Sequence, residues 1–94
     1  MKKITKVMNN IFYLLFQPKL KPFEQICYNP HFPVLIVTKK EDHKYCLLNR
    51  ANLTIIPNSE HDKIEFGDNE FIVKDKDKEE IFELKEDGRF QKKI

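Results

Sequence analysis

Four side chains in the sequence are of the kinds that bind a metal ion: Cys27, His31, His43 and Cys46. Sulfur and imidazole ligands in that combination suit a tetrahedral zinc ion. Their order, Cys-x3-His followed by His-x2-Cys, matches no zinc module that we know. His43 and Cys46 stand three residues apart on a predicted strand, so their side chains should point to opposite faces. We therefore expect no metal site, with Cys46 buried, Cys27 in a loop and both histidines in solvent.

Acid–base catalysis would need a histidine within hydrogen-bond reach of a carboxylate or a nucleophile. His61 and Asp62 are neighbours in the sequence, but in a strand their side chains diverge. The chain has two glycines, Gly67 and Gly88, both in predicted turns, and this leaves no glycine-rich phosphate loop. We see no nucleophile elbow or metalloprotease helix either, so we expect neither an enzyme nor a cofactor.

Acidic side chains are concentrated in the last third of the chain. Residues 1–59 carry nine Lys or Arg and three acids, a balance of +6, whereas residues 60–94 carry eight and twelve, a balance of −4. A carboxylate-rich strand surface can attract a basic protein such as a nuclease, although outward charges also protect sheet edges. The residues expected to bind such a partner are Asp62, Glu65, Asp68, Glu70, Asp75, Asp77, Glu79 and Glu83.

A basic patch is the alternative binding surface. Its candidate cations are Lys19, Lys21, Lys39, Lys40, Lys44 and Arg50, with Tyr28 and Phe32 nearby for stacking on bases. The sequence pI of about 8.5 is below the value expected of a strongly basic nucleic-acid binder. A nucleic-acid partner is therefore the less favoured interpretation.

The elements that must position these residues begin with a predicted amphipathic helix over residues 4–16. Its apolar side chains recur at spacings of three and four, which places them on one stripe: Ile4, Val7, Met8, Ile11, Phe12 and Leu15. We expect the stripe to pack on the protein's own sheet, although it could also bind a partner, a membrane surface or a second copy in a homodimer. Prolines at 18, 22 and 30 make residues 17–31 irregular.

Residues 32–92 show the short apolar runs and regular turn signals of an antiparallel β-meander. The apolar run Val34–Val37 indicates a central strand buried on both faces. The predicted strands cover residues 32–38, 43–49, 53–56, 62–66, 71–73, 80–84 and 89–91. The sequence thus predicts one α+β domain, residues 1–94, with a helix packed on a meander of about six or seven strands.

Part of this meander resembles the bacterial WG repeat, a short β module. The resembling residues are Lys44–Asn49, Ile55–Pro57, His61–Phe66 and Phe71–Lys74, and a partial second copy begins at Lys78. The Trp-Gly signature is absent, since Cys46 and Glu80 stand where its glycine would be. The resemblance implies a β-meander used for binding, with no catalytic residues to carry over.

As a short chain with a predicted helix, a predicted β-meander and an acidic last third, the protein also resembles the small immunity proteins of bacterial toxin systems. Two cysteines are few for a small secreted domain, no secretory cleavage site follows the N-terminus, and no apolar run is long enough to span a membrane. We therefore expect a cytoplasmic protein that binds and neutralises a basic toxin, with a WG-like scaffold module and a nucleic-acid binder as alternatives.

Overall fold

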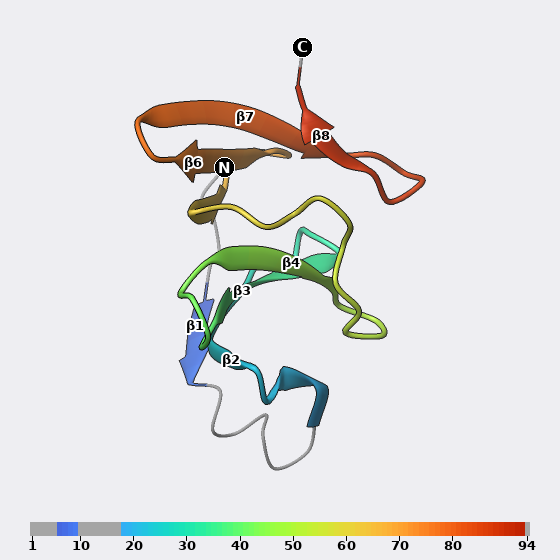
Figure 1. Ribbon diagram of the computed structural model, residues 1–94. Helices are drawn as coiled ribbons and strands as arrows, with labels where there is room; N and C mark the ends of the chain where they lie inside the picture. Colours follow the sequence, from blue (N-terminus) through green and yellow to red (C-terminus); the bar gives the residue numbers. More distant parts are fainter. Residues whose placement is uncertain (1–5, 10–17, 94) are drawn as a thin grey trace.

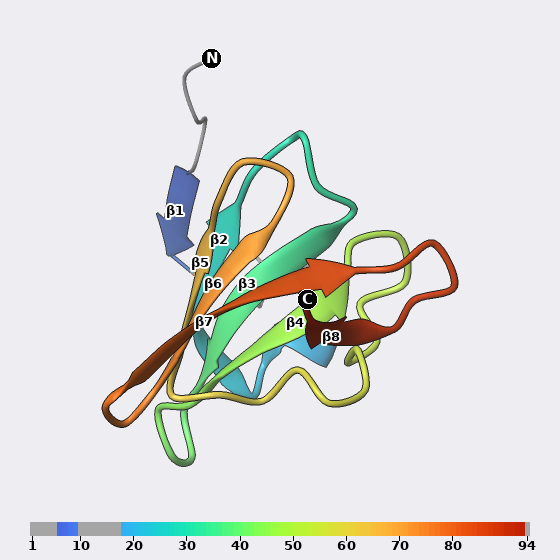
Figure 2. The same cartoon turned by 90° about the horizontal axis from the view of Figure 1, so that it is seen from above.

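The computed structural model describes residues 6–9 and 18–93, which form two antiparallel four-stranded sheets. Sheet A has the order β1-β2-β3-β4 and sheet B the order β5-β6-β7-β8, and the sheets lie one above the other (Figures 1 and 2). The strands of sheet A are β1 (Lys6–Asn9), β2 (Phe23–Tyr28), β3 (Val34–Lys39) and β4 (Tyr45–Asn49). The strands of sheet B are β5 (Lys63–Phe66), β6 (Phe71–Asp75), β7 (Lys78–Leu84) and β8 (Phe90–Lys92), and a short 3-10 helix, η1 (Pro18–Leu20), precedes β2.

The predicted α+β class is wrong, because the described part of the chain is all-β apart from η1. Within the expected helix, Lys6–Asn9 form strand β1, which pairs with β2 so that Val7 lies opposite Cys27. The open edge of β2 offers backbone hydrogen bonds to a partner strand, and such tertiary pairing overrides a local helical pattern. Residues 4–5 and 10–16 of that prediction lie outside the described residues, and so does most of the expected stripe.

Two further corrections concern the strands. Residues 17–31 were expected to be irregular, but they contain β2, whose pairing with β3 is interrupted by a bulge at Glu24. Residues 53–56 were expected to form a strand, but only Ile55 makes a bridge, to Leu48. The other predicted strands are confirmed to within a few residues at their ends.

Strand β3 is buried on both faces, as its apolar run predicts. Val34 and Ile36 point into an inter-sheet core between the two sheets, while Leu35 and Val37 point into a lower core beneath sheet A. Strand β4 alternates in the same way: Leu47 faces the inter-sheet core. Together the two cores contain most of the buried apolar side chains, and sheet A lies between them.

The two sheets repeat the same pairing pattern. In sheet A, Ile26 pairs with Val37, and Ile36 pairs with Leu47. In sheet B, the corresponding pairs are Ile64 with Val73, and Ile72 with Ile81. The paired central positions of β2, β3 and β4 therefore have equivalents in β5, β6 and β7.

The equivalence extends to the segment that follows β4. The amide of Ile56 donates to the carbonyl of Leu47, just as the amide of Lys93 donates to the carbonyl of Ile81. Ile56 and Lys93 thus hold the same place in the two sheets. Between Ile56 and β5 the chain bulges. The buried Ser59 hydroxyl accepts the hydrogen bond of the Leu47 amide and donates to the Ile56 carbonyl, so these two backbone groups are paired there.

Candidate binding cleft and polar corner

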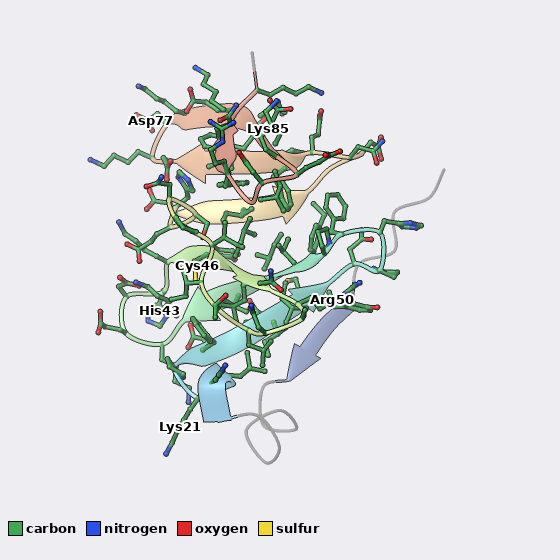
Figure 3. The ribbon with its side chains drawn as sticks, turned by 90° about the vertical axis from the view of Figure 1, so that its right-hand side faces the viewer. Lys21, His43, Cys46, Arg50, Asp77 and Lys85 are labelled. Atoms are coloured by element: carbon green, nitrogen blue, oxygen red, sulfur yellow. The ribbon has the colours of Figure 1, made fainter. Side chains whose placement is uncertain are left out.

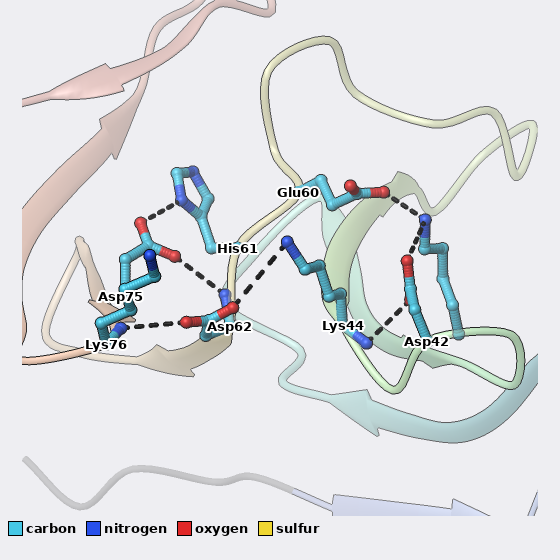
Figure 4. A network of polar contacts seen from close by, with 8 residues as sticks. Asp42, Lys44, Glu60, His61, Asp62, Asp75 and Lys76 are labelled. Carbon is cyan, nitrogen blue, oxygen red and sulfur yellow. Dashed lines mark hydrogen bonds and ion pairs between the residues drawn. The ribbon is translucent and has the colours of Figure 1, made fainter.

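A polar corner joins the two sheets where the chain passes from β4 into β5 (Figure 4). The Nδ1 atom of His61 lies 2.7 Å from Oδ2 of Asp75, whose other oxygen accepts a 2.9 Å hydrogen bond from the Asp62 amide. Asp62 in turn accepts a hydrogen bond from the Lys76 amide, and its side chain lies 4.0 Å from the Nζ atom of Lys44. These contacts fix the start of β5 against the β6–β7 turn.

His61 has a packing role in this corner. An ionised carboxylate only accepts hydrogen bonds, so Nδ1 carries the hydrogen shared with Asp75. The Nε2 atom is buried without a hydrogen-bond partner among the described residues, and the ring packs against Phe82 and Phe90 at centroid distances of 5.1 and 5.9 Å. A general base must reach the proton that it removes. Because Nε2 is buried and the ring packs on two phenylalanines, we assign His61 to the packing of the corner.

The contacts of the polar corner change the pKa of the Asp75 carboxylate. Partial burial raises its pKa, but hydrogen bonds from the Asp62 amide and the His61 ring outweigh that effect, so the pKa of Asp75 lies below its ordinary value. The sequence did not predict this pairing, because His61 was considered only with its neighbour Asp62. The two partners are brought together by the register of β5 and β6, and no local motif marks them.

A second ionic group lies beside the corner. The Nζ atom of Lys39 contacts Glu60 and lies 3.3 Å from Oδ2 of Asp42 (Figure 4). The hydrogen bond to Glu60 is the largest cause of the raised pKa of Lys39. Two of the predicted basic-patch residues, Lys39 and Lys44, therefore have acidic neighbours. Lys19, Lys21, Lys40 and Arg50 form no ion pair with any described residue, and Arg50 lies 5.4 Å from the centre of the Tyr28 ring.

The four candidate metal ligands are not brought together. Cys46 is buried in the lower core, as predicted, whereas Cys27 lies in β2 against the inter-sheet core and not in a loop. His31 lies in the β2–β3 loop, and His43 lies in the β3–β4 turn at the other end of sheet A, where it contacts Glu24. Within the described ranges, no three His, Cys, Asp or Glu side chains are grouped so that they could hold a metal ion.

Neither cysteine has the properties of a nucleophile. Burial raises the pKa of the Cys46 thiol to about 11 and also raises the pKa of Cys27. A reactive cysteine requires a thiolate and access to solvent. Cys46 is 1% exposed, so it packs as a small apolar side chain.

The eight acidic residues predicted to bind a partner divide into separate groups. Glu65, Glu70, Glu79 and Glu83 lie on the outward face of sheet B, and each has a lysine within 4 Å. Asp62 and Asp75 belong to the polar corner. Asp77 lies in the β6–β7 turn, on the same side as His43 (Figure 3), and Asp68 lies in the β5–β6 turn at the opposite end of sheet B. The structure therefore does not assemble them into one uncompensated acidic surface.

An apolar cleft opens between the two sheets at the end opposite the polar corner. Its walls are formed by Phe32, Val34 and Ile56 from the sheet A side and by Phe71 and Leu84 from sheet B, and its polar rim consists of His31, Asn49, Asn69, Lys85 and Glu86. A neighbouring hollow, which shares Ile56 and Gly88 with it, is bordered by Ile55. We call these two connected hollows the inter-sheet cleft. Ile55 is 59% exposed, the one large apolar side chain of the described chain with that much exposure.

Unpaired carboxylates also occur at the rim of the cleft. Glu86 forms part of the rim and Asp68 precedes the rim residue Asn69, and neither is in an ion pair with a described residue. Their positions follow from the β5–β6 and β7–β8 turns, which lie at the same end of sheet B. The sequence indicated Asp68 but not Glu86, and it gave no sign of the cleft, because residues from five separate segments form it.

No family model, curated protein or solved structure matches the chain. Among residues 6–9 and 18–93, no helix is long and apolar enough to cross a membrane.

Proposed function

We propose that this protein acts by binding another protein, with the inter-sheet cleft receiving an apolar side chain of a basic partner. The observation that carries the proposal is the combination, in one place, of an apolar hollow and carboxylates that form no ion pair with a described residue. Binding pockets typically combine apolar walls with a few polar groups that fix orientation. The buried thiol of Cys46 and the buried Nε2 atom of His61 support a binding role over a catalytic one.

The apolar part of the proposed site would supply affinity. Val34 and Phe71 are each 1% exposed, so the deep wall is rigid core, while Ile55 is available at the mouth. A partner side chain entering between them would remove apolar surface from water on both molecules. Anchoring side chains of this kind usually dominate the energy of a protein interface.

The unpaired carboxylates would select the sign of the partner's charge. Glu86 lies at the rim of the cleft and Asp68 lies next to the rim residue Asn69, and opposite charges at a rim increase association rate and specificity more than affinity. The acids on the outward face of sheet B contribute less to such steering, because lysines lie among them. A basic partner is therefore favoured at the cleft.

The specific role that we propose is immunity: the protein would hold and block a basic toxin, for example a nuclease, in the cytoplasm. Its two thiols are unpaired, in keeping with a reducing compartment. A WG-like scaffold module that binds a partner without toxicity is the alternative, and membership of that family stays a prediction.

A pull-down from the native cell, with nuclease treatment and mass spectrometry, tests the proposal. Charge reversal at the cleft, Asp68→Lys with Glu86→Lys, should reduce capture of the partner by about tenfold or more. The matched control reverses Glu41 and Asp77, which are also exposed and outside any ion pair with described residues but lie in the β3–β4 and β6–β7 turns, away from the cleft. Ile55→Ser should weaken capture without affecting folding, because the side chain is mostly in solvent.

The outcomes separate the alternatives. One stoichiometric basic protein that arrests growth when expressed alone, and is rescued by this chain, would support immunity. A non-toxic protein lost with the cleft variants would support a scaffold module. Equal capture by the cleft and control variants would exclude the cleft. Recovery of nucleic acid alone, from a parallel sample without nuclease, would move the site to Arg50 and the unpaired lysines Lys19, Lys21 and Lys40.

A further inference from the structure

The two sheets present equivalent faces to different environments. The face of sheet A that points toward sheet B is covered by it, whereas the equivalent face of sheet B points outward (Figure 1). The pairing registers relate the positions of the two faces one by one. At the centre both faces are apolar, because Ile36 and Leu47 of sheet A correspond to Ile72 and Ile81 of sheet B.

Around this centre the two faces differ. Val34 and Ile56, which are 1% and 7% exposed, point into the inter-sheet core. Extending the β3–β6 correspondence by one residue before Phe71 makes Glu70 the equivalent of Val34, and the matching backbone hydrogen bonds make Lys93 the equivalent of Ile56. The Nζ atom of Lys93 lies 3.1 Å from Oε1 of Glu70, so an ion pair replaces two apolar side chains at the same place in the repeat.

Three further border positions change in the same direction. Cys27, Thr38 and Tyr45 of sheet A correspond to Glu65, Lys74 and Glu79 of sheet B. In sheet B these side chains form ion pairs, with Lys74 lying 3.9 Å from Glu65 and 3.7 Å from Glu79. Covering such a face would remove these charges from water, and the desolvation cost of ion pairs commonly exceeds their mutual attraction.

We propose that the outward face of sheet B is a terminal face, closed by the Glu70–Lys93 pair against the docking of a second copy of this chain. Stacked repeat structures need a polar outer face on their last unit to remain soluble. Ile72 and Ile81 retain the apolar centre of a stacking surface, and the charged border keeps it from being covered. This assigns Glu65, Glu70 and Glu79 to closure of the stack and does not depend on the proposed partner.

The test replaces the ion pair with the residues of sheet A, in the double variant Glu70→Val with Lys93→Ile. Sedimentation velocity over a wide concentration range should show a monomeric natural protein and a variant that dimerises, its dimer dissociation constant lowered by about tenfold or more. The matched control, Glu70→Gln with Lys93→Gln, removes the charges without adding apolar surface and should stay monomeric. Adding Ile81→Arg to the double variant should abolish the dimer, because it returns a charge to the same face.

Three results would overturn the proposal: a folded double variant that stays monomeric, a glutamine control that dimerises equally, or a dimer that survives Ile81→Arg. If the double variant does not fold, the single variants Glu70→Val and Lys93→Ile take its place. Each should show weaker concentration-dependent association, and two folded, strictly monomeric single variants would equally exclude a closing role for the pair.

Discussion

Sheet A and sheet B have the same strand pairing but opposite surroundings, and their side chains differ accordingly. In sheet A, Ile36 and Leu47 lie beneath sheet B and are almost fully buried. In sheet B the equivalent residues Ile72 and Ile81 are only partly buried and are bordered by lysine and glutamate. The two sheets thus share their backbone pairing and differ in the residues that border the apolar centre.

The largest expected effect comes from exchanging one border residue between the sheets. Val34→Glu should lower the free energy of unfolding by about 3–5 kcal/mol, because an unpaired charge would be placed in the inter-sheet core. The reciprocal change, Glu70→Val, should alter it by only about 0.5 kcal/mol, because that position is on the surface. Urea denaturation measures both. If Val34→Glu does not fold, Val34→Thr should give a smaller loss of the same sign. Equal losses at both positions would contradict the claim that only the sheet A position is covered.

Truncation of the apolar centre should give the next largest difference. Leu47→Ala should cost about 2–5 kcal/mol, because Leu47 is fully buried between the sheets. Ile81→Ala should cost roughly 1 kcal/mol, since less apolar surface is removed from contact there. Thermal and urea unfolding of the two variants compare them directly, and a larger loss at Ile81 would mean that something covers the outward face of sheet B.

The polar corner predicts a dependence of stability on pH. The pKa of Asp75 is below its ordinary value of 3.8 in the folded protein, so its contribution is complete above that pH and is lost as the pH falls through the folded pKa. Asp75→Asn should lower stability at neutral pH and should remove part of the loss seen on acidification. Unfolding curves between neutral pH and strong acid test this, and an identical pH dependence in the variant would show that Asp75 does not contribute.

The smallest effect is expected for the Glu70–Lys93 ion pair itself. The variant Glu70→Gln with Lys93→Gln should change the free energy of unfolding by about 0–1 kcal/mol, because the pair is exposed to solvent. High salt should reduce even that difference through screening. A large, salt-insensitive loss in urea unfolding would mean that the pair holds sheet B together and is not merely a polar border.

The sequence predicted the strands of residues 32–92 well because their alternation is a local signal. Val34–Val37 is apolar at every position, and this indicated a central strand buried on both faces. The helix over residues 4–16 was predicted from spacing alone, and Lys6–Asn9 instead pair with β2. Tertiary contacts decide whether such a segment forms a helix or pairs with an open strand edge, and the spacing of apolar residues carries no information about those contacts.

The candidate site was harder to predict, because its residues meet only through topology. The charge imbalance indicated acids such as Glu65 and Glu79, but the lysine Lys74, which interacts with both, comes from the neighbouring strand. The cleft is formed where Ile56 and Leu84 approach across two sheets. Only the repeat registers show that Glu70 and Lys93 stand where Val34 and Ile56 stand in the other sheet.

The most direct test of the two-sheet account is the solvent accessibility of isoleucine methyl groups, measured by NMR with a soluble paramagnetic agent. We expect strong broadening for Ile55, Ile72 and Ile81, which reach the surface. We expect protection for Ile26, Ile36, Ile56 and Ile64, which lie in the two cores. Protection of Ile72 and Ile81 equal to that of Ile36 would mean that the outward face of sheet B is covered, and would contradict the account.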